Sequence, residues 1–161
     1  MGFAKIDLHR AKRQGFPEVI FGEGKTKEQI NQIIESLTQH DNVILVTRID
    51  ETKAKFVLEH HPYLQYHSVA NIVSTPIEKI KKSQNYISIL CAGTSDLAVA
   101  EEAALTAEVM GIQVKRFYDV GVSGIHRLFN HIHEIRQGKV SVVIAGMEGA
   151  LASVVGCLLY T

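Results

Sequence analysis

One stretch, residues 87–101 (ISILCAGTSDLAVAE), constrains the fold more than any other part of this 161-residue chain. Its first five residues form a nearly continuous apolar run, which is typical of a strand buried on both faces of a parallel sheet. Gly93 interrupts the run, and a helical segment then continues as far as Gly111. A strand, a turn of small residues and a helix, in that order, build the polar pockets found at the carboxyl ends of α/β sheets.

Ser95 and Asp96, which follow the strand, allow two interpretations. Either side chain can cap the helix, because its oxygen can accept a hydrogen bond from an unpaired backbone N–H of the first turn. The pair can instead line a ligand pocket. Taken alone, the cap is the commoner outcome, but two further loops of the same kind later in the chain favour the pocket.

The composition is that of a globular protein and does not favour binding to nucleic acid or to a membrane. Apolar residues make up 46% of the chain and charged residues 21%, and the formal net charge is zero, so neither nucleic acid nor a membrane surface is an expected partner. Cys91 and Cys157 lie in apolar runs without zinc or disulfide spacing, and no metal site is expected from them. The charged N-terminus does not resemble a signal peptide, and no uncharged stretch reaches about 18 residues. We therefore expect a cytoplasmic protein.

The first 75 residues predict a small α/β lobe. The basic segment 5–15, with Arg10 and Arg13 on one helical face, is either a solvated turn or an arm that reaches a phosphate or a neighbouring subunit. Thr26 and Gln29 predict a capping box at the start of a helix over 27–40. Short strands are expected at 17–22, 42–48 and 66–73, with a second helix over 51–61. The polar segment 76–85 is the candidate linker.

Residues 86–161 predict a β-α-β-α-β-α order, with strands at 86–92, 113–119 and 140–145 and a single long helix over 125–137. This order implies parallel strands joined by right-handed crossovers. The expected fold is an incomplete, flavodoxin-like, three-layer αβα domain. The last helix, from Ala150, is apolar on every side, so we expect either that the chain is truncated relative to a complete domain or that another subunit covers this surface.

Three glycine-bearing loops follow the three strands of this second domain: 93–96, 121–127 and 146–149. In a flavodoxin-like sheet the second and third strands flank the first, and ligands bind where the strand order reverses. Glycines let backbone N–H groups approach an anion, and each loop leads into a helix N-terminus. The predicted ligand is a small anion, a nucleotide or a sugar phosphate.

Four side chains in these loops are candidates for chemistry. Asp96 could bind ribose hydroxyls or hold a metal through water, or it could serve only as a cap. Arg127 could clamp a phosphate, or lie on a solvated face. His126 could move a proton near neutral pH, or only begin a helix. Glu148 is a weaker candidate, as a base or as a metal-bound carboxylate.

Three motifs carry a family resemblance: AGTSDLAVAEEAALTAEVMG, YDVGVSGIHRL and VVIAGMEGALASVV. They resemble the phosphoribosylaminoimidazole (AIR) carboxylase superfamily, whose sugar-phosphate site uses a Ser-Asp loop after the first strand and a His-Arg pair after the second. The closer resemblance is to the branch that makes pyridinium-3,5-biscarboxylic acid mononucleotide, precursor of the nickel-pincer nucleotide cofactor, also described as circadian phase modifier-like. The segment DLHRAKRQGFPEVIFGEGKT resembles the extra N-terminal lobe of that branch.

The resemblance implies a set of site residues. His126, Asp96 and Glu148 are the expected catalytic residues. The expected nucleotide- and phosphate-binding residues are Gly93, Thr94, Ser95, Asp96, Gly124, Arg127, Gly146, Met147 and Gly149.

The implied reaction is carboxylation of the pyridinium ring of nicotinic acid adenine dinucleotide, with CO2 or bicarbonate as co-substrate and hydrolysis of the phosphoanhydride to release AMP. Mg2+ would bind through substrate phosphates. The branch uses a covalent cysteine that neither Cys91 nor Cys157 matches, and its members are homo-oligomers. The alternatives are the AIR carboxylase or mutase of purine biosynthesis and a non-catalytic nucleotide-binding fragment.

Overall fold

The computed structural model describes residues 15–39 and 43–159. Most of the basic segment 5–15, with Arg10 and Arg13, lies outside this part of the chain. The chain divides into two compact units, an N-terminal unit (Met1–Lys81) and a C-terminal unit (Lys82–Thr161), which are described separately.

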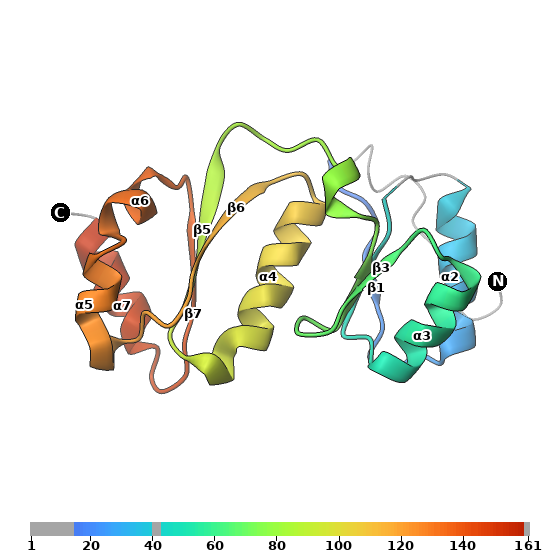
Figure 1. Cartoon of the computed structure of the whole chain (residues 1–161), viewed down its shortest axis with the longest axis horizontal. Helices are drawn as coiled ribbons and strands as arrows, with labels where there is room; N and C mark the ends of the chain where they lie inside the picture. Colours follow the sequence, from blue (N-terminus) through green and yellow to red (C-terminus); the bar gives the residue numbers. More distant parts are fainter. Residues whose placement is uncertain (1–14, 40–42, 160–161) are drawn as a thin grey trace. The chain divides into compact units, whose positions relative to one another are not determined.

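The N-terminal unit is built on a mixed sheet of four short strands in the order β1-β2-β4-β3. Strands β1 and β2 are parallel, whereas β4 runs antiparallel to both β2 and β3. Two helices, α2 and α3, complete the unit (Figure 1). The element bounds are β1 Ile20–Phe21, α2 Lys27–Thr38, β2 Leu45–Thr47, α3 Glu51–His60, β3 Gln65–His67 and β4 Ile72–Ser74.

The strand predicted over 66–73 is wrong, because this segment is a hairpin. Strand β3 ends at His67, the chain turns, and β4 begins at Ile72. Asn71 has a left-handed backbone (φ 52°), which Asn tolerates better than most residues, and its side chain accepts a hydrogen bond from the Tyr66 hydroxyl at 3.2 Å.

Helix α2 begins as its sequence predicts. The Thr26 side chain accepts from the Gln29 N–H, and the Gln29 side chain accepts from the Thr26 N–H, so the capping box is confirmed. On its buried side, Asn31 donates to Glu35 at 2.8 Å. The Asn31 oxygen is therefore left to accept from His61 Nε2, which lies 2.9 Å away and is buried.

The C-terminal unit has a parallel sheet in the order β6-β5-β7, with the first strand of the unit at its centre. This confirms the predicted flavodoxin-like α/β arrangement. Ser88, Ile89 and Leu90 in the central strand are fully buried. The element bounds are β5 Tyr86–Cys91, α4 Leu97–Val109, β6 Gln113–Phe117, α5 Ile125–Phe129, α6 Ile132–Gln137, β7 Ser141–Ile144 and α7 Ala150–Leu159.

Helices cover both faces of this sheet, which gives three layers (Figure 1). Ala100 and Ala104 of α4 pack against Ile89 and Cys91 on one face. On the other face, helices α5, α6 and α7 supply Leu128, Ile135, Leu151 and Val155, which pack with Leu90. The small side chains of α4 let that helix lie close to the strands, as expected from its alanines.

A half-buried ion-pair network ties α4 to β6. Arg116 donates two hydrogen bonds to the Glu108 carboxylate, at 2.9 and 2.7 Å, and a longer one to Glu101 at 3.3 Å. The Tyr118 hydroxyl donates to Glu101 at 2.7 Å. The hydrogen bonds to Glu108 raise the pKa of Arg116, whereas burial raises the pKa of Tyr118. The network fixes α4, the helix whose N-cap residue is Asp96.

The single long helix predicted over 125–137 is wrong, because it is two short helices, α5 and α6, separated at Asn130 and His131. The apolar spacing of the 125–137 pattern would place Leu128, Phe129 and Ile135 on one inner face of a continuous helix. Leu128 and Ile135 are fully buried, but the break turns Phe129 outward, and its side chain is 49% exposed.

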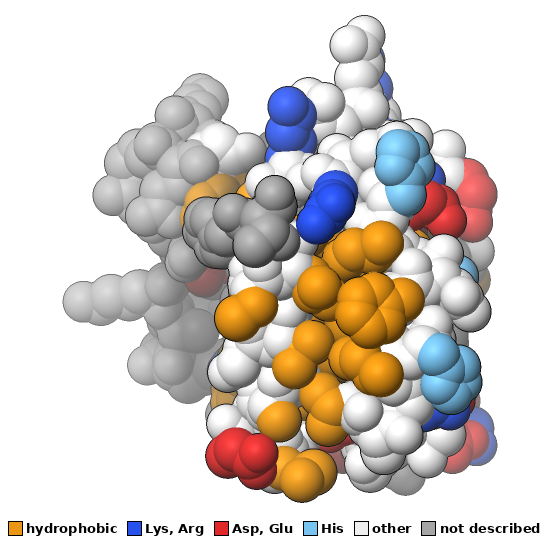
Figure 2. Space-filling model, turned by 90° about the vertical axis from the view of Figure 1, so that its left-hand side faces the viewer, with side chains coloured by type: hydrophobic (Ala, Val, Ile, Leu, Met, Phe, Trp, Pro, Cys, Tyr) orange, Lys and Arg blue, Asp and Glu red, His pale blue; other side chains and the backbone are white. Residues whose placement is uncertain are grey.

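One face of the C-terminal unit carries exposed apolar side chains, which gather over helices α5–α7 (Figure 2). A groove of about 560 Å³ runs between β7 and α7, and its apolar lining comes from Val140, Val143, Ala152, Val155 and Leu159. Within the described part of the chain, no helix is long and apolar enough to cross a membrane.

Candidate nucleotide-binding pocket

The loop after β5 carries the Ser-Asp pair. Residues Thr94–Asp96 form a 3-10 turn, η2, and α4 begins directly after it at Leu97. Asp96 occupies the N-cap position with a helical backbone (φ −94°, ψ −6°), and its side chain makes no capping hydrogen bond. The interpretation of Ser95-Asp96 as a side-chain cap is therefore wrong, because the 3-10 turn feeds the chain into α4 without one. The Asp96 carboxylate is left available for other partners.

The loop after β7 lies beside Asp96. A Cβ atom added to Gly146 would lie 3.8 Å from Asp96 Oδ1, with nothing nearer in this region. The loop turns through Met147 and Gly149, both with left-handed backbones (φ 54° and 78°), and helix α7 follows at Ala150. Met147 is 86% exposed. This loop brings the N-terminus of α7 to the same edge of the sheet as Asp96.

The loop after β6 is tied to the end of β5 by backbone hydrogen bonds. Val120 N–H donates to Cys91 at 3.0 Å, and Gly121 N–H donates to Ala92 at 2.9 Å. Gly121 has no room for a side chain, because an added Cβ would lie 2.7 Å from the Ala92 carbonyl oxygen. The close approach of these two loops holds Ser123 over the same edge.

Together the three loops enclose a pocket of about 320 Å³, which is within the range of small-molecule sites. Its polar side chains are one carboxylate, from Asp96, and two hydroxyls, from Ser95 and Ser123. The pocket is lined by Ala92, Gly93, Ser95, Asp96, Gly121, Val122, Ser123, Ala145, Gly146, Met147, Ala150 and Leu151. Such a mixture of hydroxyls, one carboxylate and helix N-termini can accept hydrogen bonds from sugar hydroxyls and donate them to phosphate oxygens.

The structure brings some of the candidate residues together and leaves others outside the lining. Five of them line the pocket: Gly93, Ser95, Asp96, Gly146 and Met147. Six do not: Thr94, Gly124, His126, Arg127, Glu148 and Gly149. His126 and Glu148 are exposed, so their catalytic roles stay predictions.

Ser123 lines the pocket but was not among the residues singled out from the sequence. The signal was present, because Ser123 and Gly124 precede α5 much as Thr94–Asp96 precede α4. Hydroxyl side chains in the strand-end loops, and not charged side chains alone, are therefore the sequence signal for this pocket.

Arg127 is held by an ion pair within the loop after β6 and the start of α5. Its Nη1 donates to Asp119 Oδ2 at 2.7 Å. An added Cβ on the buried Gly124 would lie 2.7 Å from the guanidinium, so a side chain at this position would require the guanidinium to move. Arg127 Nε is buried and has no hydrogen-bond acceptor among the described residues. The cation is therefore partly exposed, with its position defined by Asp119.

Neither cysteine is placed to act as a nucleophile in the pocket. Cys91 is 1% exposed and donates to the Gly93 carbonyl at 3.1 Å. Burial, and then the charge of Asp96, raise the pKa of its thiol, which disfavours the nucleophilic thiolate. Cys157 is exposed on α7 and does not line the pocket.

Among residues 15–39 and 43–159, no group of three His, Cys, Asp or Glu side chains lies close enough together to hold a metal ion. Asp96 is the one carboxylate in the pocket lining. A Mg2+ ion there would depend on oxygens from the ligand, because Mg2+ sites of this kind commonly combine one or two carboxylates with substrate phosphates.

Two comparisons with known proteins bear on this site. Residues 1–78 match the family model described as LarB/PurE-like N-terminal domain. The chain is also similar to the uncharacterized protein MJ0165 of Methanocaldococcus jannaschii, at 37% identity over 163 residues, covering 96% of this chain and 63% of that protein. The chain thus spans less than two thirds of the length of this relative. These findings show that the N-terminal residues are similar to a LarB/PurE-like N-terminal domain and that the chain as a whole is similar to MJ0165.

Proposed function

We propose that the pocket of the C-terminal unit binds a nucleotide, and that its substrate is nicotinic acid adenine dinucleotide. The reaction is carboxylation of the pyridinium ring together with hydrolysis of the phosphoanhydride, which releases AMP, in the biosynthesis of the nickel-pincer cofactor. The observation that carries this proposal is the convergence of three strand-end loops on Asp96. The LarB/PurE-like match of residues 1–78 supports the choice of branch.

The lining residues suggest how a nucleotide would be held. The Asp96 carboxylate can accept two hydrogen bonds from the vicinal hydroxyls of a ribose, and it makes no capping bond that would compete. The Ser95 and Ser123 hydroxyls and the N-terminus of α7 can donate to phosphate oxygens. Arg127, four residues after the lining residue Ser123, is the nearest candidate in sequence to supply positive charge to a phosphate.

The carboxylation step and the hydrolysis step have different chemical requirements. Carboxylation replaces a ring C–H by C–CO2−, so one proton must leave, and His126 is the candidate to move it. Hydrolysis adds one water across the phosphoanhydride and needs the phosphates to be held in place. Cys91 is buried and Cys157 lies outside the pocket, so no covalent step is assigned to either thiol. Binding, AMP release and carboxylation are therefore measured separately.

The test is incubation of the purified chain with nicotinic acid adenine dinucleotide, labelled bicarbonate and Mg2+. AMP release and label in the pyridine product support the proposal. Turnover of aminoimidazole ribotide in place of the dinucleotide would support the purine-pathway alternative, and tight binding without turnover would support a binding module. Each of the last two results contradicts the proposed reaction.

Matched variants locate the site. Asp96→Asn removes the charge of the pocket carboxylate, and we expect nucleotide affinity to fall about tenfold or more, because hydrogen bonds to charged groups contribute about 1.5–3 kcal/mol. Asp50→Asn is the control, since Asp50 caps α3 in the N-terminal unit and Asn is an equally good cap. Equal affinities for both variants and the parent would remove Asp96 from the site.

A further inference from the structure

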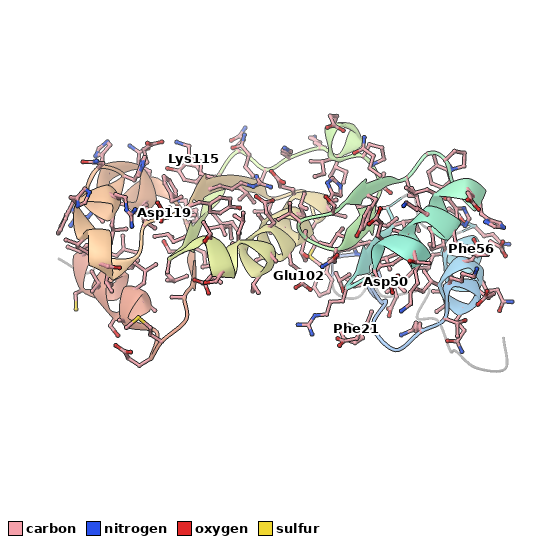
Figure 3. All side chains as sticks on the ribbon, turned by 60° about the horizontal axis from the view of Figure 1, so that its bottom comes forward. Phe21, Asp50, Phe56, Glu102, Lys115 and Asp119 are labelled. Carbon is pink, nitrogen blue, oxygen red and sulfur yellow. The ribbon has the colours of Figure 1, made fainter. Side chains whose placement is uncertain are left out.

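Asp119 has an unusual backbone at the end of β6. Its φ is 57°, the left-handed conformation that few residues other than glycine adopt. The residues on both sides are tied down: the Tyr118 hydroxyl donates to Glu101, and Val120 N–H donates to the Cys91 carbonyl. Figure 3 shows Asp119 on the segment that leads from β6 towards α5. Its neighbours therefore hold this conformation in place.

The left-handed turn directs the Asp119 carboxylate to Arg127, eight residues further along the chain. Oδ2 accepts from Arg127 Nη1 at 2.7 Å. The guanidinium also lies against Gly124, where an added Cβ would be 2.7 Å from it. The backbone conformation of Asp119 and the hydrogen bond from Arg127 are thus the features that place this cation.

Stability does not account for this arrangement. The side chains of Arg127 and Asp119 are 41% and 59% exposed, and ion pairs of that exposure contribute at most about 1 kcal/mol. A left-handed non-glycine residue costs a comparable amount, although Asp bears it better than most. The pair therefore yields little net stabilisation, and what it does provide is a defined position for the guanidinium.

We propose that Asp119 is a positioning residue that fixes the Arg127 guanidinium. Gly121 and Ser123, which lie between the two residues in the chain, both line the pocket. The use of the cation, to meet an anionic group of the ligand, rests on the proposed nucleotide-binding function. The positioning itself is a property of the ligand-free chain and can be measured without substrate.

The first test is 15N NMR of arginine side chains in the full chain without ligand. The Nε–Hε signal of Arg127 is assigned by its loss in Arg127→Lys. In the parent we expect a heteronuclear NOE close to that of the backbone, and in Asp119→Gly a clear fall towards that of a mobile side chain. Glycine suits the left-handed backbone, so this variant removes the carboxylate without new strain. An unchanged NOE in Asp119→Gly would overturn the proposal.

Two further variants separate positioning from general loosening. Asp119→Asn keeps the backbone and one acceptor oxygen, so we expect an intermediate NOE. Glu134→Gln removes the Lys115–Glu134 ion pair, which is similarly exposed and 2.9 Å long but away from the pocket. This control should leave the Arg127 signal as in the parent. A fall in the control equal to that in Asp119→Gly would also overturn the proposal.

The second test measures binding of nicotinic acid adenine dinucleotide by calorimetry. Asp119→Gly and Arg127→Ala should each weaken it, Asp119→Gly by roughly threefold to tenfold, and the double variant should bind no more weakly than Arg127→Ala alone. Parent-like binding by Asp119→Gly beside weak binding by Arg127→Ala contradicts the inference and leaves the proposed function standing. If the parent binds no dinucleotide, the proposed function fails, and the NMR result alone decides the role of Asp119.

Discussion

Two glycines that line the pocket should respond in opposite ways to the same added methyl group. Gly121 has an ordinary backbone (φ −59°), but a Cβ there would lie 2.7 Å from the Ala92 carbonyl oxygen. Gly93 is extended (φ −151°), and a Cβ there would have no atom within 4 Å. Alanine at position 121 must therefore push two loops apart, whereas alanine at position 93 enters open space.

The expected magnitudes follow from these distances. Overpacking against a backbone atom costs about 1–3 kcal/mol, and Gly→Ala returns about 0.4–1 kcal/mol by restricting the unfolded chain. Gly121→Ala should therefore destabilise the C-terminal unit by about 1–2 kcal/mol. For a unit of this size, that corresponds to a melting temperature lower by roughly 5–15 °C. Gly93→Ala should leave the melting temperature unchanged or raise it by a few degrees.

The assay is thermal unfolding together with hydrogen exchange of peptides from β5 and β6, which reports on the C-terminal unit separately. The same samples are titrated with nicotinic acid adenine dinucleotide. Gly121→Ala should lose both stability and affinity, because the Gly121–Ala92 contact shapes the pocket. Gly93→Ala should lose affinity alone, since the new methyl group occupies ligand space. Equal melting temperatures for the two variants would refute the steric reasoning.

Three further predictions concern stability. Burial lowers the pKa of His61, so protonation of its imidazole favours the unfolded chain. The contribution of neutral His61 to the free energy of unfolding should therefore be complete above about pH 6.5 and be lost as the pH falls below that value. His61→Gln should flatten this part of the stability–pH profile. Arg116→Met leaves the Glu108 side chain, only 10% exposed, without its two strongest bonds, and should cost about 1.5–3 kcal/mol by denaturant titration. Thr26→Ala removes the cap of α2 and should cost about 1 kcal/mol in the N-terminal unit, measured by hydrogen exchange of α2 peptides.

The parts of the fold that could be predicted are those marked by short sequence patterns. The apolar run at the start of residues 87–101 identifies β5, and the Thr26–Gln29 spacing identifies the start of α2. The order of strands and helices in 86–161 implies parallel pairing with β5 at the centre. These inferences need only periodicity, capping chemistry and the handedness of crossovers.

The parts that could not be predicted depend on backbone conformations that residue type does not determine. Asp96 has the chemistry of a cap, but the 3-10 turn before α4 removes its capping role. The break at Asn130 interrupts a helix without glycine or proline to mark it. The Asp119–Arg127 contact requires a positive φ at Asp119, and the spacing of residues does not predict this backbone conformation.

The proposed function depends most on whether the three strand-end loops form one nucleotide-binding site. The direct measurement is 15N–1H NMR of the chain during titration with nicotinic acid adenine dinucleotide. The account predicts shift changes concentrated at residues 93–96, 121–123 and 146–151, and their loss in Asp96→Asn. Saturable shifts confined to other parts of the chain, with these three loops unaffected, would contradict it.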